Sequence, residues 1–427
     1  MSGKGWKSFH VKDLAKKVPN SLSTGPFGSA ISSKFFKESG IPVIRGSNLS
    51  SDIGIRLIDK DLVYLTTEKA SEFQRSVVRK GDLIFTCWGT INQVGLIDKR
   101  SKFSEYIISN KQMKFTPDNS QVDSLFLYYL FSSPLMSQKI LDCGIGSSVP
   151  GFNLGQLKSM QLHIPLLPTQ KAIDHILGTL DDKIELNLRM NETLESIARA
   201  IFKSWFIDFD PVRAKAEGRQ PEGMDTTTAA LFPSEFEIIE GQEIPKGWQV
   251  KPISEVIELA YGKALKEENR IQGNIPVYGS NGQIGWHNEK LASGPGIIIG
   301  RKGNPGVVTW SKTDFFAIDT TFFVKLMDKK LSLQFFRFLL EYEDLPSLGA
   351  DSAVPGLNRN HVYMSKIILP NVEILNKFES SISSLDQYLL KNENQIKTLI
   401  SIRDTLLPKL LSGELPITNP DQFIKGI

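Results

Sequence analysis

The chain has 427 residues, a formal net charge of +3 and only two cysteines, Cys87 and Cys143. This length exceeds that of one ordinary domain, so we expect two or three domains. Apolar residues make up 41% and charged residues 23% of the chain, as in folded soluble proteins. No apolar run reaches the roughly eighteen residues that would predict a membrane span.

The first residues and the cysteines indicate the compartment. Residues 1–11 are polar and basic, with no apolar core of the kind that a secretory signal requires. Two cysteines cannot by themselves form a metal cluster, and a cytosolic chain keeps them reduced. We therefore expect a cytoplasmic protein with two free thiols.

Charge alternates along the chain. Residues 1–165 carry 21 Lys and Arg against 13 Asp and Glu, a net charge of +8. Residues 166–245 carry 8 against 15, a net charge of −7, and residues 246–370 return to +3. A basic block suits a polyanion because Lys and Arg displace counterions from phosphates, although an excess of three charges is also typical of an ordinary surface.

The first block, residues 1–165, has the pattern of a mixed α/β domain. Short apolar runs such as Asp82–Thr86 lie between clusters of Gly, Pro, Asn and Ser, which predicts strands joined by turns. One helical stretch is expected over Val122–Leu141.

A long helix is predicted next, over residues 166–210. Its apolar residues alternate spacings of four and three, which is the pattern of a coiled-coil seam, the row of residues that faces a partner helix. The seam residues are Ile173, Leu177, Leu180, Ile184, Asn187, Asn191, Leu194, Ala198, Ile201 and Trp205. Residues 211–245 are expected to form a linker.

The second block, residues 246–370, repeats the pattern of the first. Strands are predicted at Gly296–Ile299 and Phe322–Lys325, and a helix at Ser332–Glu341. A second long helix follows over residues 371–415, with a tail at 416–427. Its seam residues are Phe378, Ile382, Leu385, Leu389, Asn392, Ile396, Leu399, Arg403, Leu406 and Leu410. We expect Ile402 to share the seam where Arg403 interrupts it, and Pro408 to end or kink the helix near Leu407.

An internal repeat connects the two halves at a constant offset of 205 residues. Residues 149–153 (VPGFN) match residues 354–358 (VPGLN), and 12 of 59 positions are identical over 148–206 against 353–411. A weaker similarity between the two halves precedes this repeat: Ile41-Pro42-Val43 corresponds to Ile275-Pro276-Val277. The sequence therefore predicts an α+β protein with a pseudo-twofold internal repeat: two mixed α/β domains joined by two long helices.

The two helices are the obvious partners of each other. If they pair as an antiparallel coiled coil, Asn187 and Asn392 meet near its centre, where a buried Asn pair would fix the register at a cost in stability. The alternative is that each Asn faces solvent at the edge of the seam.

Polar loops rich in glycine are the candidates for ligand contact in both domains. Glycine lets the backbone approach a ligand closely, whereas Arg, Lys, Asn, Gln, Ser and Thr bind base edges and phosphates. The candidates in the first domain are Ser23, Gly25, Phe27, Ser29, Arg45, Ser47, Asn48, Thr86, Trp88, Thr90, Asn92, Ser147 and Ser148. Those in the second are Asn281, Arg301, Lys302, Asn304 and Ser352. Each of these loops could also be an ordinary polar turn, and Trp88 could be a packing residue.

Common catalytic signatures are missing from the sequence. We find no P-loop, no dinucleotide-binding glycine motif, no zinc-ligand spacing and no Asn/Asp-Pro-Pro-aromatic tetrapeptide of amino-methyltransferases. The glycine-rich segment 300–306 lacks the Lys-Ser/Thr of a P-loop and resembles a basic β-turn. We therefore expect neither a catalytic residue nor a metal site.

The helical segments resemble those of the specificity subunits of bacterial type I restriction-modification systems. The resemblance is carried by residues 166–173 (LLPTQKAI), 180–184 (LDDKI), 200–212 (AIFKSWFIDFDPV), 244–248 (IPKGW) and 406–415 (LLPKLLSGEL). It covers essentially the whole chain, but the two globular domains match only in layout.

The resemblance implies a function without catalysis. Each globular domain would be a target recognition domain that reads one half of a bipartite, asymmetric DNA target. The helices would set the gap between the half-sites and dock two modification subunits, which use S-adenosylmethionine, while restriction subunits that hydrolyse ATP would join the complex. This chain would bind no cofactor itself.

Two other functions stay open on the sequence alone. A methyltransferase with its own fused recognition domain would bind S-adenosylmethionine, and the missing tetrapeptide argues against it. A coiled-coil adaptor that binds only proteins would show no salt-dependent DNA binding, and the basic first domain argues against that.

Overall fold

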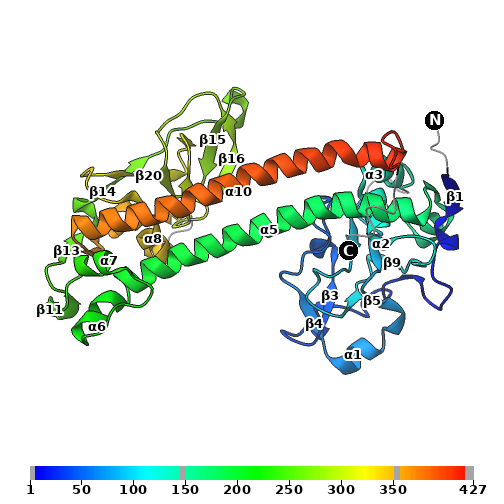
Figure 1. Cartoon of the computed structure of the whole chain (residues 1–427), viewed down its shortest axis with the longest axis horizontal. Helices are drawn as coiled ribbons and strands as arrows, with labels where there is room; N and C mark the ends of the chain where they lie inside the picture. The colour runs from blue at the N-terminus through cyan, green and yellow to red at the C-terminus, as the bar shows by residue number, and fades with distance from the viewer. Residues whose placement is uncertain (1–4, 145–150, 351–355, 419–427) are drawn as a thin grey trace. The chain divides into compact units, whose positions relative to one another are not determined.

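The computed structural model describes residues 5–144, 151–350 and 356–418, which form two compact units (Figure 1). Unit 1 comprises residues 1–188 and 394–427, and unit 2 comprises residues 189–393. The boundary cuts both long helices, α5 (Leu167–Phe206) and α10 (Val372–Ser412). Each unit therefore contains one globular domain of the sequence and one half of each long helix.

Within its described residues, unit 1 has three small sheets. Their strand orders are β1-β10, β2-β9-β6-β7 and β4-β3-β8-β5. The strands are β1 (Lys7–His10), β2 (Leu22–Thr24), β3 (Ile41–Ile44), β4 (Val63–Leu65), β5 (Val77–Arg79), β6 (Leu83–Thr86), β7 (Val94–Leu96), β8 (Glu105–Ile108), β9 (Gln112–Phe115) and β10 (Gln161–Ile164). The helices of this domain are α1 (Thr67–Ser71), α2 (Ser124–Ser132), α3 (Pro134–Asp142) and α4 (Leu154–Ser159).

Unit 2 repeats this arrangement with local differences. The strand orders that correspond are β13-β23, β14-β20-β17-β18 and β16-β15-β19. The strands are β13 (Gln249–Pro252), β14 (Ile257–Tyr261), β15 (Ile275–Gly279), β16 (Gly282–His287), β17 (Gly296–Gly300), β18 (Val308–Ser311), β19 (Phe316–Ala317), β20 (Thr321–Leu326) and β23 (Lys366–Leu369). A two-stranded pair, β21 (Gly349–Ala350) with β22 (Gly356–Leu357), and helices α8 (Leu333–Tyr342) and α9 (Arg359–Met364) complete the domain.

The two Ile-Pro-Val segments occupy the same place in the repeat. Val43 on β3 pairs in parallel with Ile107 on β8, and Val277 on β15 pairs in parallel with Phe316 on β19. Each of the two strands also forms an antiparallel pair with the strand that follows it. The sequence echo therefore reflects one duplicated fold, as predicted.

The helix predicted over Val122–Leu141 is two helices. Asp123 caps α2 by accepting from the amides of Leu125 and Phe126. Pro134 then stops this helix, because the residue before a proline avoids the helical conformation. Ser133 is accordingly extended and caps α3, which begins with Pro134.

Residues 211–245, expected as a linker, contain regular structure. They hold most of α6 (Asp210–Ala216), then α7 (Thr226–Leu231) and a hairpin of β11 (Phe236–Ile239) with β12 (Gln242–Pro245). Val212 and Phe232 belong to the hydrophobic core of unit 2, together with Trp205 and Phe206 of α5. This segment thus packs as part of unit 2.

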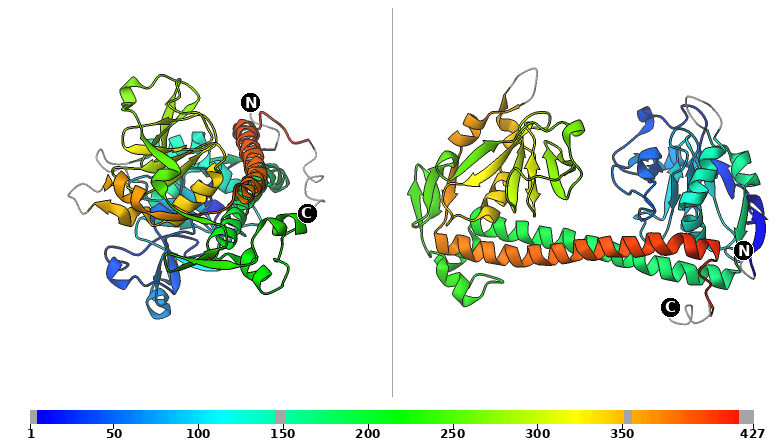
Figure 2. Two further views of the ribbon diagram at one scale, coloured as in Figure 1. Left: turned by 90° about the vertical axis from the view of Figure 1, so that its left-hand side faces the viewer. Right: turned by 90° about the horizontal axis from the view of Figure 1, so that it is seen from above.

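Within each unit the halves of α5 and α10 pack against each other, and both views of Figure 2 show them side by side. In unit 1, Asn187 contacts Gln395 while Asp181 contacts Arg403. In unit 2, Asn191 contacts Asn392 while the ring of Phe202 lies 6.1 Å from that of Phe378. In both units one residue number falls as the other rises, so the pairing is antiparallel, as predicted.

The predicted seam residues lie at the packed face of each helix. Those that are fully buried are Ile173, Leu177, Ile184, Asn187, Ala198, Trp205, Phe378, Ile382, Leu389, Asn392, Arg403 and Leu410. Those that are partly buried are Leu180, Asn191, Leu194, Ile201, Leu385, Ile396, Leu399 and Leu406. The heptad spacing therefore identified the correct face of both helices.

The two seam asparagines are buried, but their partners differ from the prediction. Asn187 is 1% exposed and donates to Oε1 of Gln395 at 3.0 Å. Asn392 is 7% exposed and donates to Oδ1 of Asn191 at 2.9 Å. Each asparagine therefore bonds to an amide residue of the other helix, and the predicted Asn187–Asn392 bond is replaced by these two bonds.

The structure corrects two expectations about the second helix. Arg403 stays in the seam with 3% of its surface exposed, whereas Ile402 is 42% exposed. Arg403 can be buried because its charge is paired with the buried carboxylate of Asp181. Helix α10 also does not end near Leu407, because it continues through Pro408 to Ser412; the expected alternative of a kink at Pro408 stays a prediction. A proline lacks only one amide donor, and the helix ends instead at Gly413, whose φ of +76° is readily adopted by glycine.

An aspartate ties each domain to its helices, and it is buried in unit 1 and partly buried in unit 2. In unit 1, Oδ2 of Asp181 on α5 accepts from Tyr129 at 2.6 Å and from Arg56 at 3.2 Å. In unit 2, Asp386 accepts from Gln334 at 2.5 Å and lies 3.7 Å from Arg337. Asp181 and Asp386 are equivalent positions of the sequence repeat, so the repeat preserves the attachment point of each domain.

Candidate nucleic-acid interface

One loop pair has the same backbone geometry in both domains. In unit 1, the loop after β6 forms a β-bridge between Trp88 and Gly151, and the amide of Phe152 donates to the carbonyl of Cys87 at 2.8 Å. In unit 2, the loop after β17 forms a β-bridge between Lys302 and Gly356, and the amide of Leu357 donates to the carbonyl of Arg301 at 2.9 Å. We call the two segments that meet at this bridge the bridged loops of each domain. They are residues 87–88 with 151–152 in unit 1, and residues 301–302 with 356–357 in unit 2.

The repeat in the sequence preserves the framework of the bridged loops. Asn153 caps α4 by accepting from the amide of Gln156, and Asn358 caps α9 by accepting from the amide of Asn360. Gly151 leaves room for the Trp88 ring, because an added Cβ would lie 2.7 Å from it. The framework is therefore shared, whereas the side chains beside it differ between the two domains.

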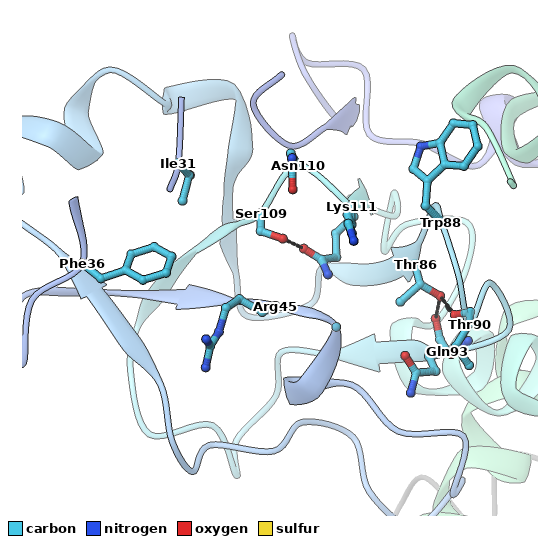
Figure 3. Close-up of a pocket in the computed structure, with 12 residues that line it drawn as sticks. Ile31, Phe36, Arg45, Thr86, Trp88, Thr90, Gln93, Ser109, Asn110 and Lys111 are labelled. Atoms are coloured by element: carbon cyan, nitrogen blue, oxygen red, sulfur yellow. Dashed lines mark hydrogen bonds between the residues drawn. The ribbon is translucent and has the colours of Figure 1, made fainter. Parts of the chain in front are cut away.

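In unit 1 the bridged loops border a recess of about 450 Å³ that both polar and apolar residues line (Figure 3). It brings together the predicted residues Arg45, Thr86, Trp88 and Thr90. The residues that sequence reasoning missed there are Gln93, Ser109, Asn110, Lys111 and Gln112. These lie on turns and strand ends without a motif of their own, so only the tertiary fold reveals them.

Two side chains of this recess are of the kinds that bind nucleic acids. The indole of Trp88 is 55% exposed. Arg45 donates through Nη2 to the carbonyl of Asp61 at 2.9 Å, but its buried Nε has no partner among the described residues. An aromatic face and a held guanidinium are groups that bind bases and phosphates.

The loop that contains the predicted residues Gly25, Phe27 and Ser29 lies next to this recess. Phe27 is 77% exposed, and the guanidinium of Arg75 lies 5.2 Å from the centroid of its ring. Asn110, which lines the recess, donates to the carbonyl of Gly28 at 3.1 Å. Gly25 is fixed by packing instead, because an added Cβ would lie 1.8 Å from the carbonyl oxygen of Ser109.

In unit 2 the bridged loops border a second recess of about 370 Å³. The predicted residues Arg301 and Lys302 line it together with Tyr261, Asn358 and Arg359, which sequence reasoning missed. The signal for Asn358 was its place in the sequence repeat. Arg359 and Tyr261 meet only in the tertiary structure, where the guanidinium lies 5.0 Å from the ring centroid.

Several predicted contact residues have structural roles. Asn48 is 1% exposed and donates to the carbonyls of Ile58 and Lys60. Ser23 is buried and donates to the carbonyl of Arg75, and Asn92 donates to Ser137 of α3. Since these polar groups are already bonded within the protein, we leave them out of the proposed interface.

Other predicted residues keep exposed side chains. These are Phe27, Ser29, Ser47, Trp88, Thr90, Asn281, Lys302 and Asn304. Thr86 is buried and its hydroxyl donates to the carbonyl of Thr90, so it shapes the loop. Ser147, Ser148 and Ser352 lie outside the described residues.

Burial makes two groups near the bridged loops unsuitable for chemistry or phosphate binding. Burial raises the pKa of the Cys87 thiol to about 12, so it stays protonated and weakly nucleophilic. Burial also lowers the pKa of Lys114, whose ammonium donates to the carbonyl of Val77 at 2.7 Å. Both side chains therefore serve the core.

Two other kinds of site concern residues 5–144, 151–350 and 356–418, the part of the chain that the structure describes. There, no three His, Cys, Asp or Glu side chains gather in a way that could hold a metal ion. No helix of that part is both long enough and apolar enough to cross a membrane.

Comparison with known proteins identifies the family. The family model described as "Type I restriction modification DNA specificity domain" matches residues 3–196 and again residues 245–401. The chain is 28% identical over 409 residues to the Type I restriction enzyme HindI specificity subunit of Haemophilus influenzae, covering 80% of this chain and 88% of that protein. It is 26% identical over 384 residues to the Type I restriction enzyme MjaIX specificity subunit of Methanocaldococcus jannaschii, covering 82% of each.

A solved structure shows the same fold. The S subunit of a type I restriction-modification system from M. genitalium aligns with a TM-score of 0.59 at 18% identity, covering 96% of this chain and 97% of that one. The two matches of the family model correspond to the two copies of the internal repeat. The chain therefore belongs to the family of type I restriction-modification DNA specificity proteins.

Proposed function

We propose that this chain is the DNA sequence-specificity subunit of a type I restriction-modification complex, and that each globular domain reads one half of a bipartite, asymmetric target. The observation that carries the proposal is the pair of bridged loops, which share a backbone framework but present different side chains. A common scaffold with different exposed groups suits the reading of two unlike half-sites, because base edges are distinguished by the side chains that meet them.

The long helices have a separate role in this proposal. They connect the two recognition domains and set the number of unread base pairs between the half-sites. They also dock two modification subunits, and restriction subunits join that complex. Apolar side chains that remain exposed on α5 and α10 support a protein-binding role; they are Leu186, Leu188, Met190, Ile197, Tyr388, Leu390 and Ile402.

Catalysis is assigned to the partner subunits. We propose that S-adenosylmethionine binds to the modification subunits and ATP to the restriction subunits, while this chain binds neither. The names of its relatives, which are specificity subunits, support this division of labour.

Methylation mapping tests the proposal. The chain is expressed with a modification subunit from the same system, and methylated adenines are located across the genome. A split motif with a fixed gap is the expected result. Exchange of residues 1–165 for another such domain should alter one half of the motif only, and insertion of one heptad in each helix should widen the gap.

The purified chain distinguishes the proposed function from the two alternatives, a methyltransferase with its own recognition domain and an adaptor that binds only proteins. A methyltransferase would bind S-adenosylmethionine as the purified chain alone, which calorimetry would detect. A protein-only adaptor would show no DNA affinity that falls with rising salt. Either result, together with the absence of a split methylation motif, would contradict the proposed function.

A further inference from the structure

The bridged loops of unit 2 hold a cluster of three cations. Arg301, Lys302 and Arg359 line one recess, and its lining includes no aspartate or glutamate. The Arg301 guanidinium lies 5.2 Å from the centroid of the Tyr261 ring, and that of Arg359 lies 5.0 Å from it. Three cations that line one recess, with no carboxylate among its described lining residues, favour an acceptor supplied from outside the chain.

The two arginines of this cluster differ in their freedom. Arg301 donates through Nη2 to the carbonyl of Asp319 at 2.8 Å, and its guanidinium also lies 5.8 Å from the ring of Phe322. It is therefore anchored in the protein and helps to hold Tyr261.

Arg359 is oriented but not bonded. Its guanidinium lies 5.0 Å from the ring centroid of Tyr261 and 5.6 Å from that of Tyr363. Its buried Nε has no hydrogen-bond partner among the described residues, as is also true of Arg301; the difference is that Arg301 donates through Nη2, whereas no bond of the Arg359 side chain is found there. Stacking on tyrosines fixes the plane of the guanidinium without occupying its donors, which reduces the entropy lost on binding.

Strand register shows what occupies the same positions in unit 1. In unit 1, Met113 pairs with Phe85 on one side and with Thr24 on the other. In unit 2, Phe322 pairs in the same way with Ile299 and with Tyr261. Thr24 and Met113 thus stand where unit 2 has Tyr261 and Phe322. The bridge and the sequence repeat place Cys87 at the position of Arg301 and Leu154 at that of Arg359. The equivalent positions of the first domain therefore carry no charge.

We propose that Arg359 reads a guanine in the half-site of the second recognition domain, and that the first domain makes no arginine–guanine contact at the equivalent position. A planar guanidinium with free donors matches the O6 and N7 acceptors of guanine in the major groove, and this pairing is the most common specific contact of arginine. A phosphate offers the same acceptor chemistry without sequence information, so the experiment distinguishes the two. The inference rests on the proposed function.

The test compares variants of the complete complex with its modification subunits. The target of the native complex is first determined by methylation mapping, and each base pair of the second half-site is then replaced in turn in a DNA-binding competition. For the native complex, one G·C pair should be preferred. Arg359→Leu should reduce the preference for that pair about 10- to 100-fold, as expected for the loss of a bidentate contact, and leave the other positions unchanged.

Arg359→Lys separates guanine from phosphate. Lysine retains the charge but lacks the planar pair of donors, so it should recover at most part of the preference for guanine. If Lys restores native binding, and Leu weakens all sequences equally, the arginine contacts phosphate and the inference is overturned. Because Lys leaves the charge in place, this variant also keeps the test valid if Arg359→Leu fails to fold.

A matched control removes an arginine elsewhere in unit 2. The side chain of Arg219 is 62% exposed and pairs only with its neighbour Glu217 among the described residues. Arg219→Leu should leave the preference for every base pair unchanged. A native complex without any defined target would contradict the proposed function, whereas a defined second half-site without a G·C pair would overturn this inference alone.

Discussion

The Nη1 atom of Arg403 lies 3.1 Å from the Oδ1 atom of Asp181, and both residues are buried, with 3% and 2% of their surface exposed. Asp181 belongs to α5 and Arg403 to α10, and the other carboxylate oxygen of Asp181 accepts from Arg56 of the globular domain. One carboxylate therefore joins three separate segments of unit 1.

Replacement of Asp181 should destabilise the chain strongly. Asp181→Ala leaves Arg56 buried with Asp98 and Tyr129 as its partners, and Arg403 buried with Asp404. Loss of one member of a buried ion pair costs about 3–5 kcal/mol when an uncompensated charge stays in the interior. Because each arginine keeps one carboxylate, we expect a loss near the lower end of this range, about 3 kcal/mol. Urea unfolding of the full chain, followed by circular dichroism, measures the loss.

The adjacent aspartate is the control for this variant. Asp182 is exposed and bonds to Lys99 at 2.8 Å and to Arg100 at 2.7 Å. Asp182→Ala should therefore cost less than about 1 kcal/mol, as is usual for surface ion pairs. Equal losses for the two variants would show that the buried network does not hold unit 1 together.

The long helices and the duplication could be predicted from sequence because both leave a periodic signal. A heptad of apolar residues requires only local spacing, and a repeat requires only identity at a fixed offset. The misplacement of Ile402 shows the limit of this reasoning. Arg403 can stay buried only because Asp181 lies beside it, and the 222 residues that separate the two conceal this partnership.

The contact residues were harder to predict for the same reason. Asn48 has the residue type and loop setting of a base-reading group, yet its amide bonds to the carbonyls of Ile58 and Lys60. Arg359 lies in no glycine loop, and its stacking on Tyr261 joins residues 98 positions apart. Composition indicates which loops are polar, but tertiary contacts decide which of their side chains stay free.

The stability of unit 1 should depend on pH through Asp174. Burial, and then repulsion by Asp123, raises the pKa of its carboxyl to about 8. Between about pH 4 and pH 8 the folded chain keeps this proton and the unfolded chain loses it. Stability should therefore fall as pH rises through this window, by up to about 1.4 kcal/mol per pH unit, and level off above it.

Asp174→Asn isolates this contribution from those of the other carboxyl groups. An asparagine cannot ionise, so the difference in unfolding free energy between variant and native chain should grow in favour of the variant from about pH 4 to pH 8. Thermal and urea unfolding at several pH values measure that difference. If the difference stays constant with pH, Asp174 is already ionised in the folded chain at neutral pH.

The seam asparagine of unit 1 should limit stability. Asn187 is 1% exposed and makes one hydrogen bond across the helices, to the exposed side chain of Gln395. Asn187→Leu replaces a buried amide by an apolar group, and water can solvate the freed Gln395. We expect a gain on the order of 1 kcal/mol, measured by urea unfolding.

An exposed asparagine of the same helix pair provides the comparison. Asn394→Leu changes the same residue type on the solvent side of α10, so stability should stay within about 0.5 kcal/mol of the native value. A loss of stability in Asn187→Leu would mean that the Asn187–Gln395 bond contributes more than the apolar contact that replaces it.

The bridged loops of unit 1 should be sensitive to a single methyl group. An added Cβ at Gly151 would lie 2.7 Å from the Trp88 ring, so Gly151→Ala must displace the indole or separate the two loops. If Trp88 contributes to reading the first half-site, this variant should lower methylation at native targets about 10-fold, which corresponds to the roughly 1–3 kcal/mol of a base–aromatic contact. Methylation mapping should show relaxed sequence at the first half-site only, with the second half-site unchanged.

Gly178→Ala is the matched control. Gly178 lies inside α5, and its added Cβ would make an ordinary 3.5 Å contact with Leu125 of α2. The control should keep the native motif and gain up to about 1 kcal/mol from its higher helix propensity. A native motif in Gly151→Ala, with the tryptophan displaced, would exclude Trp88 from base recognition.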